Sequence, residues 1–309
     1  MRLAGQGQAP APASTEGTPV FRTGVTQVRV DVQVTDHDGN VITGLTRDDF
    51  AVFDEDVPQP VAYFGRDRDP LSLLLLLDVS GSMRKYLDQM SNTAEKALRY
   101  LRVGDRVAVM LFSRRSEVTQ PFTGDLVQVA EKIRDSSNEH DLGAGTAINE
   151  SILDSVSYMA RYKGSEFGNR QDRRAILILT DNLSLNYKTP DSKVTGELLR
   201  EDTVLNAIVV GKAERPGAPR PGVYQNPDFT PADVFKLAEQ TGGEAVKVNR
   251  ADQSFPEMME RIRTRYTLAY NAPEAKSGTF RQIRVELTPA ARRRYPGAVV
   301  RARSGYYVQ

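Results

Sequence analysis

Three oxygen-bearing side chains follow directly after the most apolar run of the chain. Asp78, Ser80 and Ser82 come after the leucines 73–77 in the stretch LLLLLDVSGSM. Such a short run cannot cross a bilayer, which needs ~20 apolar residues. It is typical of a strand that is buried on both faces of a parallel sheet. Because open parallel sheets bind ligands at the carboxyl ends of their strands, we expect these side chains to hold a ligand.

Two further loops carry side chains of the same kind. Gly145 and Thr146 stand just ahead of a predicted helix, and Thr180 and Asp181 follow the apolar strand AILIL. Carboxylates and hydroxyls without His or Cys form a hard-oxygen set, which suits Mg²⁺, with Mn²⁺ or Ca²⁺ as alternatives, rather than zinc or copper. An ion held largely by neutral hydroxyls remains electron-poor and can accept one more oxygen. The sequence therefore predicts a metal site that takes a carboxylate from a partner, built from Asp78, Ser80, Ser82, Thr146 and Asp181.

Composition excludes several classes of function. The chain has 309 residues, with 41 Lys plus Arg against 40 Asp plus Glu. A formal net charge of +1 gives no basis for a nucleic-acid or membrane-surface partner. The absence of Cys excludes disulfides and thiolate metal sites. No apolar run reaches the 18 residues of a transmembrane candidate, and nothing in the sequence indicates an oligomeric state.

The two ends of the chain are predicted to be rich in strands. Residues 25–64 alternate apolar and polar side chains, with turns expected at 38–40 and 54–58. Three strand-like runs, RYTLAYNAP, FRQIRVELTP and VVRARSGYYVQ, close the chain. Since an isolated hairpin is only marginally stable, we expect 21–69 and 263–309 to form one β-sandwich-like domain. Residues 1–20, rich in Ala, Pro and Gly, read as a disordered tail without the apolar core of an intact signal peptide.

Residues 70–262 alternate strand and helix patterns, which indicates an α/β domain. We predict a doubly wound, mostly parallel sheet with helices on both faces and with SEVTQPFT as an antiparallel edge strand. One helix is expected from Tyr86 to Leu101, where apolar residues recur at helical spacing. Others are expected over DLVQVAEKIRD, Ala147–Ala160, ADVFKLAEQTGG and SFPEMMERIRTRY, and a loop is expected at 212–222.

The site residues resemble a known family. The order D-x-S-x-S, then a threonine, then an aspartate on a third loop is that of the von Willebrand factor type A domain and its metal-ion-dependent adhesion site. Here the pattern is filled by Asp78, Ser80, Ser82, Thr146 and Asp181, and the resemblance covers roughly Pro70 to Tyr266. It implies a doubly wound fold with the metal at the top of the sheet and capture of an acidic side chain of a protein partner. Asn182 stands where many relatives have glycine.

The flanks resemble a bacterial group of von Willebrand factor A-related proteins. The stretches VDVQVTDHDGNVITGLTRDDFAVFDEDVPQPVAYF and RARSGYYV carry this likeness. Members of that group are usually predicted to be exported, so the resemblance implies a periplasmic or extracellular location.

Other interpretations were weighed for the same residues. Asp and Ser are good helix N-caps, so the first loop alone could be a cap. The sequence lacks G-x-S-x-G at Ser80 and any phosphate-binding P-loop, so we predict that the protein is not an enzyme. A metal-dependent hydrolase, or a structural subunit whose metal only stabilises the fold, remain as alternatives. DHDGN lacks the spacing of a calcium loop, His37 is expected in solvent, and His140 could approach the metal loops.

Overall fold

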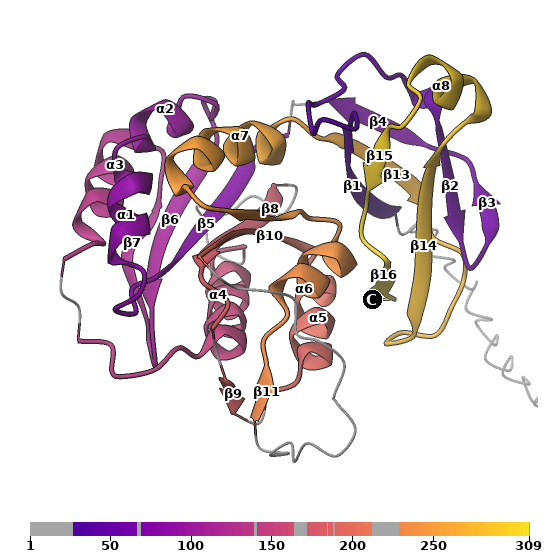
Figure 1. Cartoon of the computed structure of the whole chain (residues 1–309). Helices are drawn as coiled ribbons and strands as arrows, with labels where there is room; N and C mark the ends of the chain where they lie inside the picture. Colours follow the sequence, from indigo (N-terminus) through magenta and orange to yellow (C-terminus); the bar gives the residue numbers. More distant parts are fainter. Residues whose placement is uncertain are drawn as a thin grey trace, which may run out of the picture.

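The computed structural model describes residues 27–66, 69–138, 141–163, 172–183, 185–187, 189–211 and 229–308. The predicted tail at 1–20, the predicted loop at 212–222 and His140 lie outside the described residues. Two parts lie side by side: an α/β domain and a pair of antiparallel sheets from the chain ends (Figure 1). Within the described residues, no helix is both long and apolar enough to span a membrane.

The α/β domain is built on a six-stranded sheet. Its strand order is β12-β10-β8-β5-β6-β7, and only β7 is antiparallel to its neighbour. The strands are β5 (Leu71–Asp78), β6 (Arg106–Phe112), β7 (Ser116–Thr123), β8 (Arg173–Thr180), β10 (Thr203–Val210) and β12 (Ala245–Val248). The predicted mostly parallel sheet with an antiparallel edge strand is confirmed, and β5 lies at its centre.

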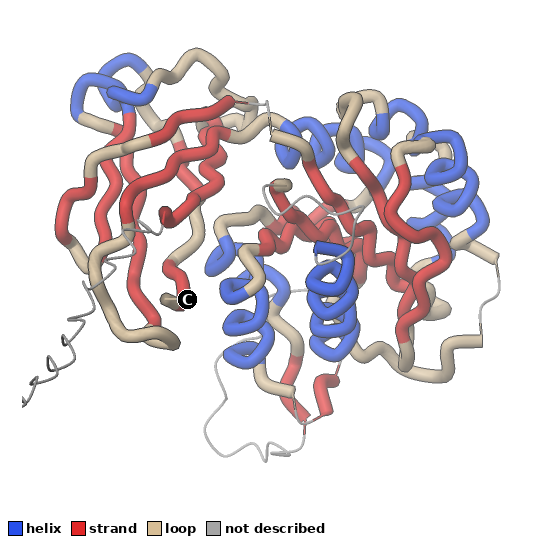
Figure 2. Tube along the Cα trace, turned by 180° about the vertical axis from the view of Figure 1, so that it is seen from behind, coloured by secondary structure: helices blue, strands red, loops and turns tan. Residues whose placement is uncertain are grey.

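Helices cover both faces of this sheet, as Figure 2 shows from behind. One face carries α1 (Arg84–Ser91), α2 (Ala94–Leu98), α3 (Leu126–Asp135) and α7 (Ala251–Arg263). The other carries α4 (Ile148–Lys163), α5 (Asp191–Arg200) and α6 (Val234–Thr241). A two-stranded ribbon pairs β9 (Leu185–Tyr187) with β11 (Phe229–Pro231). The doubly wound class predicted from the sequence is therefore correct.

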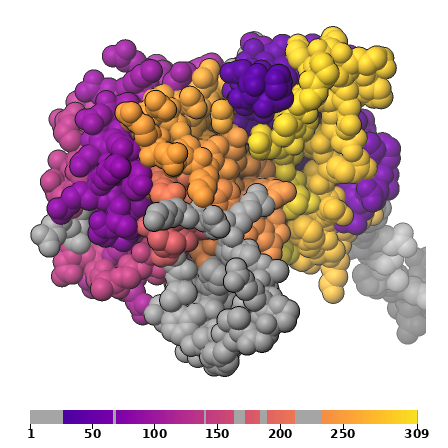
Figure 3. Space-filling model, viewed as in Figure 1, coloured from indigo at the N-terminus to yellow at the C-terminus, as the bar shows by residue number. Residues whose placement is uncertain are grey.

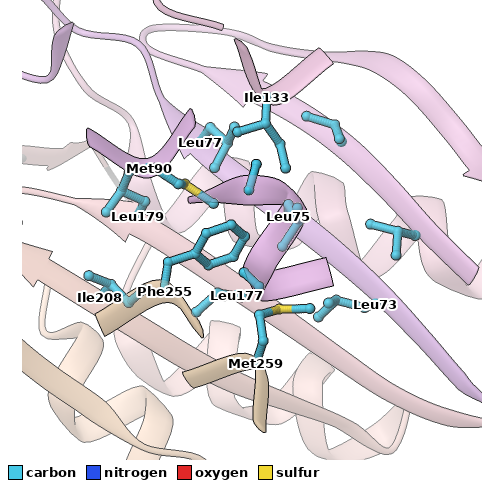
Figure 4. Close-up of a cluster of buried hydrophobic side chains, with 14 of the residues drawn as sticks. Leu73, Leu75, Leu77, Met90, Ile133, Leu177, Leu179, Ile208, Phe255 and Met259 are labelled. Atoms are coloured by element: carbon cyan, nitrogen blue, oxygen red, sulfur yellow. The ribbon is translucent and has the colours of Figure 1, made fainter. Parts of the chain in front are cut away.

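The leucine run is buried because alternate side chains enter two different cores. Leu73, Leu75 and Leu77 pack with Phe255 and Met259 of α7 in one cluster (Figure 4). Leu74 and Leu76 enter the cluster on the opposite face of the sheet, under α4, α5 and α6. A strand with helices on both faces needs apolar residues at every position, which explains why this run does not alternate.

The chain ends form two four-stranded sheets that share one core. The sheet orders are β15-β1-β13-β4 and β16-β14-β2-β3. Their strands are β1 (Gln27–Thr35), β2 (Phe50–Asp54), β3 (Val57–Gln59), β4 (Tyr63–Arg66), β13 (Tyr266–Asn271), β14 (Phe280–Leu287), β15 (Val299–Arg301) and β16 (Gly305–Tyr307). The 3-10 turn η1 (Arg47–Asp49) and helix α8 (Pro289–Arg294) connect strands. Figure 3 shows N-terminal indigo and C-terminal yellow residues massed together beside the α/β domain.

Ion pairs join the two parts at the end of the sheet where its strands begin. Arg173, the first residue of β8, donates through Nε to Asp31 Oδ2 of β1 at 3.0 Å. Arg303 lies 2.7 Å from Asp202, which precedes β10. Glu244, just before β12, contacts Arg301 at 3.4 Å. The two chain-end sheets therefore pack against the amino ends of the strands of the six-stranded sheet, away from their carboxyl ends.

Two predicted elements differ in the structure. The helix expected over 86–101 is divided into α1 and α2, because Thr93 donates its hydroxyl to the carbonyl of Met90 and the chain turns there. The hairpin expected after β1 makes its turn at 36–40, but its second arm is a single bridge between Val41 and Thr35. The second predicted hairpin is confirmed as β2 and β3.

Candidate metal site

Strand β5 delivers Asp78 to the carboxyl end of the sheet, and three hydrogen-bonding groups meet there. The Asp78 side chain is fully buried. Its Oδ1 accepts from the backbone N–H of Ser80 at 2.9 Å, and its Oδ2 accepts from the Thr180 hydroxyl at 2.8 Å. Because Thr180 ends the neighbouring strand β8, this carboxylate is held by a side chain of the adjacent strand and by the backbone of its own loop.

The first and third predicted loops are joined by a direct hydrogen bond. Ser82 Oγ donates to Asp181 Oδ2 at 2.7 Å, and Ser80 Oγ lies 3.4 Å from Ser82 Oγ. The other oxygen of Asp181 accepts from the backbone N–H of Leu183 at 3.0 Å. Four of the five predicted ligands, those other than Thr146, thus form one continuous hydrogen-bonded set.

Thr146 reaches the same edge through its backbone neighbours. Ala147 donates its N–H to the carbonyl of Ser113 at 2.8 Å, and Ser113 follows Phe112, which is opposite Asp78 in the sheet register. Thr146 is partly exposed there. The loop bends sharply before it, since Gly143 and Gly145 have φ angles of +84° and +100°, in the left-handed region that favours glycine.

The third loop makes its turn at Asn182. This residue has a φ of +55°, a conformation in which Asn is one of the few tolerated residues besides glycine. Its N–H donates to Thr180 Oγ1 at 3.1 Å. The asparagine that replaces the glycine of many relatives therefore keeps the turn and leaves Asp181 directed at Ser82.

The electrostatics of these residues fit a bound cation. Burial raises the pKa of Asp78 to about 6, against the lowering effect of hydrogen bonds from Ser80 and Thr180, and the nearby Asp181 raises it further. Within the described residues neither carboxylate forms an ion pair with Lys or Arg. No group of three or more His, Asp or Glu side chains converges anywhere in that part of the chain. A metal here would therefore rely on hydroxyl oxygens as well as on the two carboxylates.

Two hydroxyl residues that support the site are not among the five predicted ligands. Thr180 holds Asp78, and the hydroxyl of Ser113 anchors the second loop by donating to the carbonyl of Gly143 at 2.8 Å. Each is a hydroxyl residue at the end of an apolar strand, which is the signal that could have identified them. Of the histidines, His37 is exposed in the turn after β1, as expected.

A family model of the von Willebrand factor type A domain matches residues 73–183. No curated protein matches the chain. Among solved structures, the conserved hypothetical protein BatB from Bacteroides thetaiotaomicron is similar at 17% identity and a TM-score of 0.46, over 62% of this chain and 97% of that one. A von Willebrand factor type A protein from Catenulispora acidiphila is similar at 12% identity and a TM-score of 0.46, over 94% and 76%.

Proximal thread matrix protein 1 from the mussel byssus, in a structure described as having a zinc-occupied adhesion-site motif, is similar at 16% identity and a TM-score of 0.45. That likeness covers 64% of this chain and 48% of the mussel chain. The family-model match begins in β5 at Leu73 and ends at Leu183, so it includes all three loops of the candidate site. Within the α/β part, residues 73–183 therefore match the von Willebrand factor type A domain, the family that the motifs resemble.

Proposed function

We propose that this protein is a metal-dependent binding module that captures an Asp or Glu side chain of a protein partner. Asp78, Ser80, Ser82, Thr146 and Asp181 would hold the ion, with Mg²⁺ as the expected metal and Mn²⁺ or Ca²⁺ as alternatives. The observation that carries the proposal is the 2.7 Å hydrogen bond from Ser82 to Asp181, which brings the first and third loops together. A bound divalent ion would supply a Lewis-acidic position for one anionic oxygen.

The set of donors explains why such a site would bind carboxylates. Three of the five proposed ligands are neutral hydroxyls, so the ion would keep more affinity for a further anion than an ion held by carboxylates alone. Ser80 and Ser82 lie on a solvent-facing loop, which leaves room for a side chain from another molecule. Asp78, by contrast, is buried and held by Thr180, which preorganises the site.

The same contacts favour binding over catalysis. A serine nucleophile needs a base within hydrogen-bond reach, yet Ser82 donates to a carboxylate that is itself a predicted metal ligand. His37 lies in the turn after β1, in the other part of the molecule. We therefore propose that the protein has no enzymatic activity. Turnover of a phosphate or ester substrate that depends on metal and on Ser82 would favour the hydrolase alternative instead.

Metal binding can be tested with a matched pair of double variants. Ser80→Ala/Ser82→Ala removes two proposed ligands, whereas Ser91→Ala/Ser137→Ala removes hydroxyls that donate to helix carbonyls elsewhere. Changes even outside the first coordination shell cost about 10–100-fold in metal affinity, so we expect at least a tenfold loss in the site variant only. Calorimetric titration with Mn²⁺ and Mg²⁺ measures this. Equal affinities in the two variants would contradict the proposal.

Carboxylate capture needs a second measurement. With Mn²⁺ bound, the relaxation rate of water protons reports on water coordinated to the ion. An aspartate-containing peptide should lower that rate, whereas the same peptide with asparagine should leave it unchanged. If the two peptides behave alike, the ion serves the fold rather than a partner.

We also propose that the protein acts outside the cytoplasm. The support is the resemblance of its β-rich flanks to a bacterial group that is usually predicted to be exported. Detection of the native protein in the periplasmic or culture fraction of its source cell would test this. Recovery from the cytoplasm alone would contradict it.

A further inference from the structure

Exposed cations stand on the first metal loop. Arg84 and Lys85 open α1 directly after Met83, and both side chains are exposed. Within the described residues neither forms an ion pair. The first turn of α1 contains no acidic residue. Because the amino end of a helix is electropositive, cations there are unfavourable. Arg84 and Lys85 therefore lower the stability of α1, so helix stability does not explain why they stand there.

Two more cations stand beside the second metal loop. Arg114 and Arg115 form the exposed turn between β6 and β7. Arg115 donates its N–H to the carbonyl of Leu142 at 3.0 Å and its guanidinium to the carbonyl of Asp141 at 3.1 Å. A Cβ on Gly143 would lie 3.1 Å from Cβ of Arg114. Both arginines are thus fixed against the loop that carries Thr146.

The charge around the candidate site is unbalanced toward the positive. Residues 79–88, 113–116, 141–147 and 182–183 surround the site, and their only acidic residues are Asp88 and Asp141. They contain four basic residues, Arg84, Lys85, Arg114 and Arg115, which we call the basic rim. Since the whole chain has a net charge of only +1, this excess is local. A divalent ion in the site would offset the charges of Asp78 and Asp181, which lie outside these segments, so the positive excess of the segments would remain.

Resting on the proposed function, we propose that the captured carboxylate belongs to an acidic segment of the partner protein. The metal takes one carboxylate, and the basic rim attracts further Asp or Glu side chains on either side of it. The positive charges of the basic rim favour a partner segment with negative charges. A nucleic acid is disfavoured, because affinity for the phosphate backbone comes from several Lys and Arg contacts and the basic rim has only four such side chains. Rim charges act mainly on association rate and partner choice.

Synthetic peptides test this directly on the full chain. One peptide has a central Asp flanked by Ser and Gly, and the second has the same Asp flanked by Glu on both sides. Exposed charge pairs contribute about 0.2–1 kcal/mol each, so two of them should make the second peptide bind roughly 2- to 30-fold more tightly in Mg²⁺. Fluorescence polarisation measures both affinities. The preference should shrink as salt rises from about 0.05 M to about 0.5 M, because salt screens exposed charges.

Matched variants locate the source of the preference. Arg84→Gln/Lys85→Gln removes two rim charges next to the first loop. Lys96→Gln/Arg293→Gln removes the same charge from exposed positions on α2 and α8. We expect the rim variant to lose at least about half of the preference, measured as free energy, and to keep the Mg²⁺ affinity of the parent. The control variant should keep the full preference.

The outcomes separate this inference from the proposed function. If neither peptide binds in a metal-dependent way, the proposed function fails and the inference fails with it. If both bind equally in Mg²⁺, or if the rim variant keeps the full preference, the function stands and the acidic-segment inference is wrong. Binding of a single-stranded oligonucleotide that competes with the peptides would also overturn it, in favour of a phosphate ligand.

Discussion

We predict that Asp54 strongly stabilises the two β-sheets that the chain ends form. This buried carboxylate at the end of β2 accepts hydrogen bonds from the hydroxyls of Tyr270 at 2.8 Å and Tyr306 at 3.0 Å. It also pairs with the guanidinium of Arg281 at 2.6 Å. Its partners come from β13, β16 and β14, so one N-terminal side chain ties together three C-terminal strands.

The expected loss in the free energy of unfolding depends on which polar groups each substitution leaves without a partner. Asp54→Ala leaves a largely buried guanidinium and two buried hydroxyls without their acceptor, which should cost about 3–5 kcal/mol in the free energy of unfolding. Tyr306→Phe removes one hydrogen bond to a charged acceptor and should cost about 1.5–3 kcal/mol. Burial and the Asp54 carboxylate raise the pKa of Tyr270, so this tyrosine remains a donor at neutral pH.

Urea denaturation followed by circular dichroism gives the free energies. Asp48→Ala is the control, since its side chain is 90% exposed and 3.7 Å from its exposed ion-pair partner Arg47. An exposed ion pair contributes at most about 1 kcal/mol. A loss in Asp54→Ala no larger than the loss in Asp48→Ala would refute the reasoning that the two chain ends are stabilised as one unit by this carboxylate.

Three further predictions concern other parts of the molecule. A chain ending at residue 265 lacks β13 to β16, so β1 and β2 lose their central partners; it should aggregate in size-exclusion chromatography, and a monomer with undiminished β signal would contradict the shared unit. Although burial acts to raise it, the pKa of Asp31 is lowered by the charges of Arg173, Arg29 and Arg265. The contribution of Asp31 to the free energy of unfolding is therefore complete above its unfolded pKa of about 3.9 and is lost as the pH falls through the lower folded pKa. In Arg173→Met, the free energy of unfolding should therefore fall less steeply with decreasing pH below about pH 4. Asn182→Gly should leave Mg²⁺ affinity within about twofold, since glycine accepts the same φ, and a larger loss in calorimetry would assign the asparagine side chain a role in the site.

Sequence reasoning succeeded where burial is uniform along an element. Strands β5, β8 and β10 are buried at every position, so their apolar runs identify them without any periodicity. The helix expected over ADVFKLAEQTGG is found as α6, which ends at Gly242 with a φ of +79°. The oxygen-bearing loops were predictable for a related reason, because parallel strands direct all their carboxyl ends to one edge.

Prediction from the sequence failed where the buried face of an element includes polar or small residues. Helix α5 was not predicted, because its buried face includes Thr195 and Gly196 beside its leucines. A Cβ on Gly196 would lie 3.6 Å from the hydroxyl of Tyr307 in β16, and the Thr195 hydroxyl donates to Gln240 at 2.7 Å. These contacts involve segments distant in sequence, so no local pattern reports them.

The ion pairs that join the two parts of the molecule and the candidate metal residues lie at opposite ends of the six-stranded sheet. Arg173, Glu244 and Asp202 hold the chain-end sheets at the amino ends of the strands. The candidate metal residues lie at the carboxyl ends. Strands β5 and β8 are each eight residues long, so their two ends are roughly 23 Å apart at the usual rise of a strand. The two chain-end sheets therefore contact the α/β domain at the edge opposite the candidate metal residues. The partner that we propose would approach the edge that carries the candidate metal residues, while the opposite edge carries the structural ion pairs.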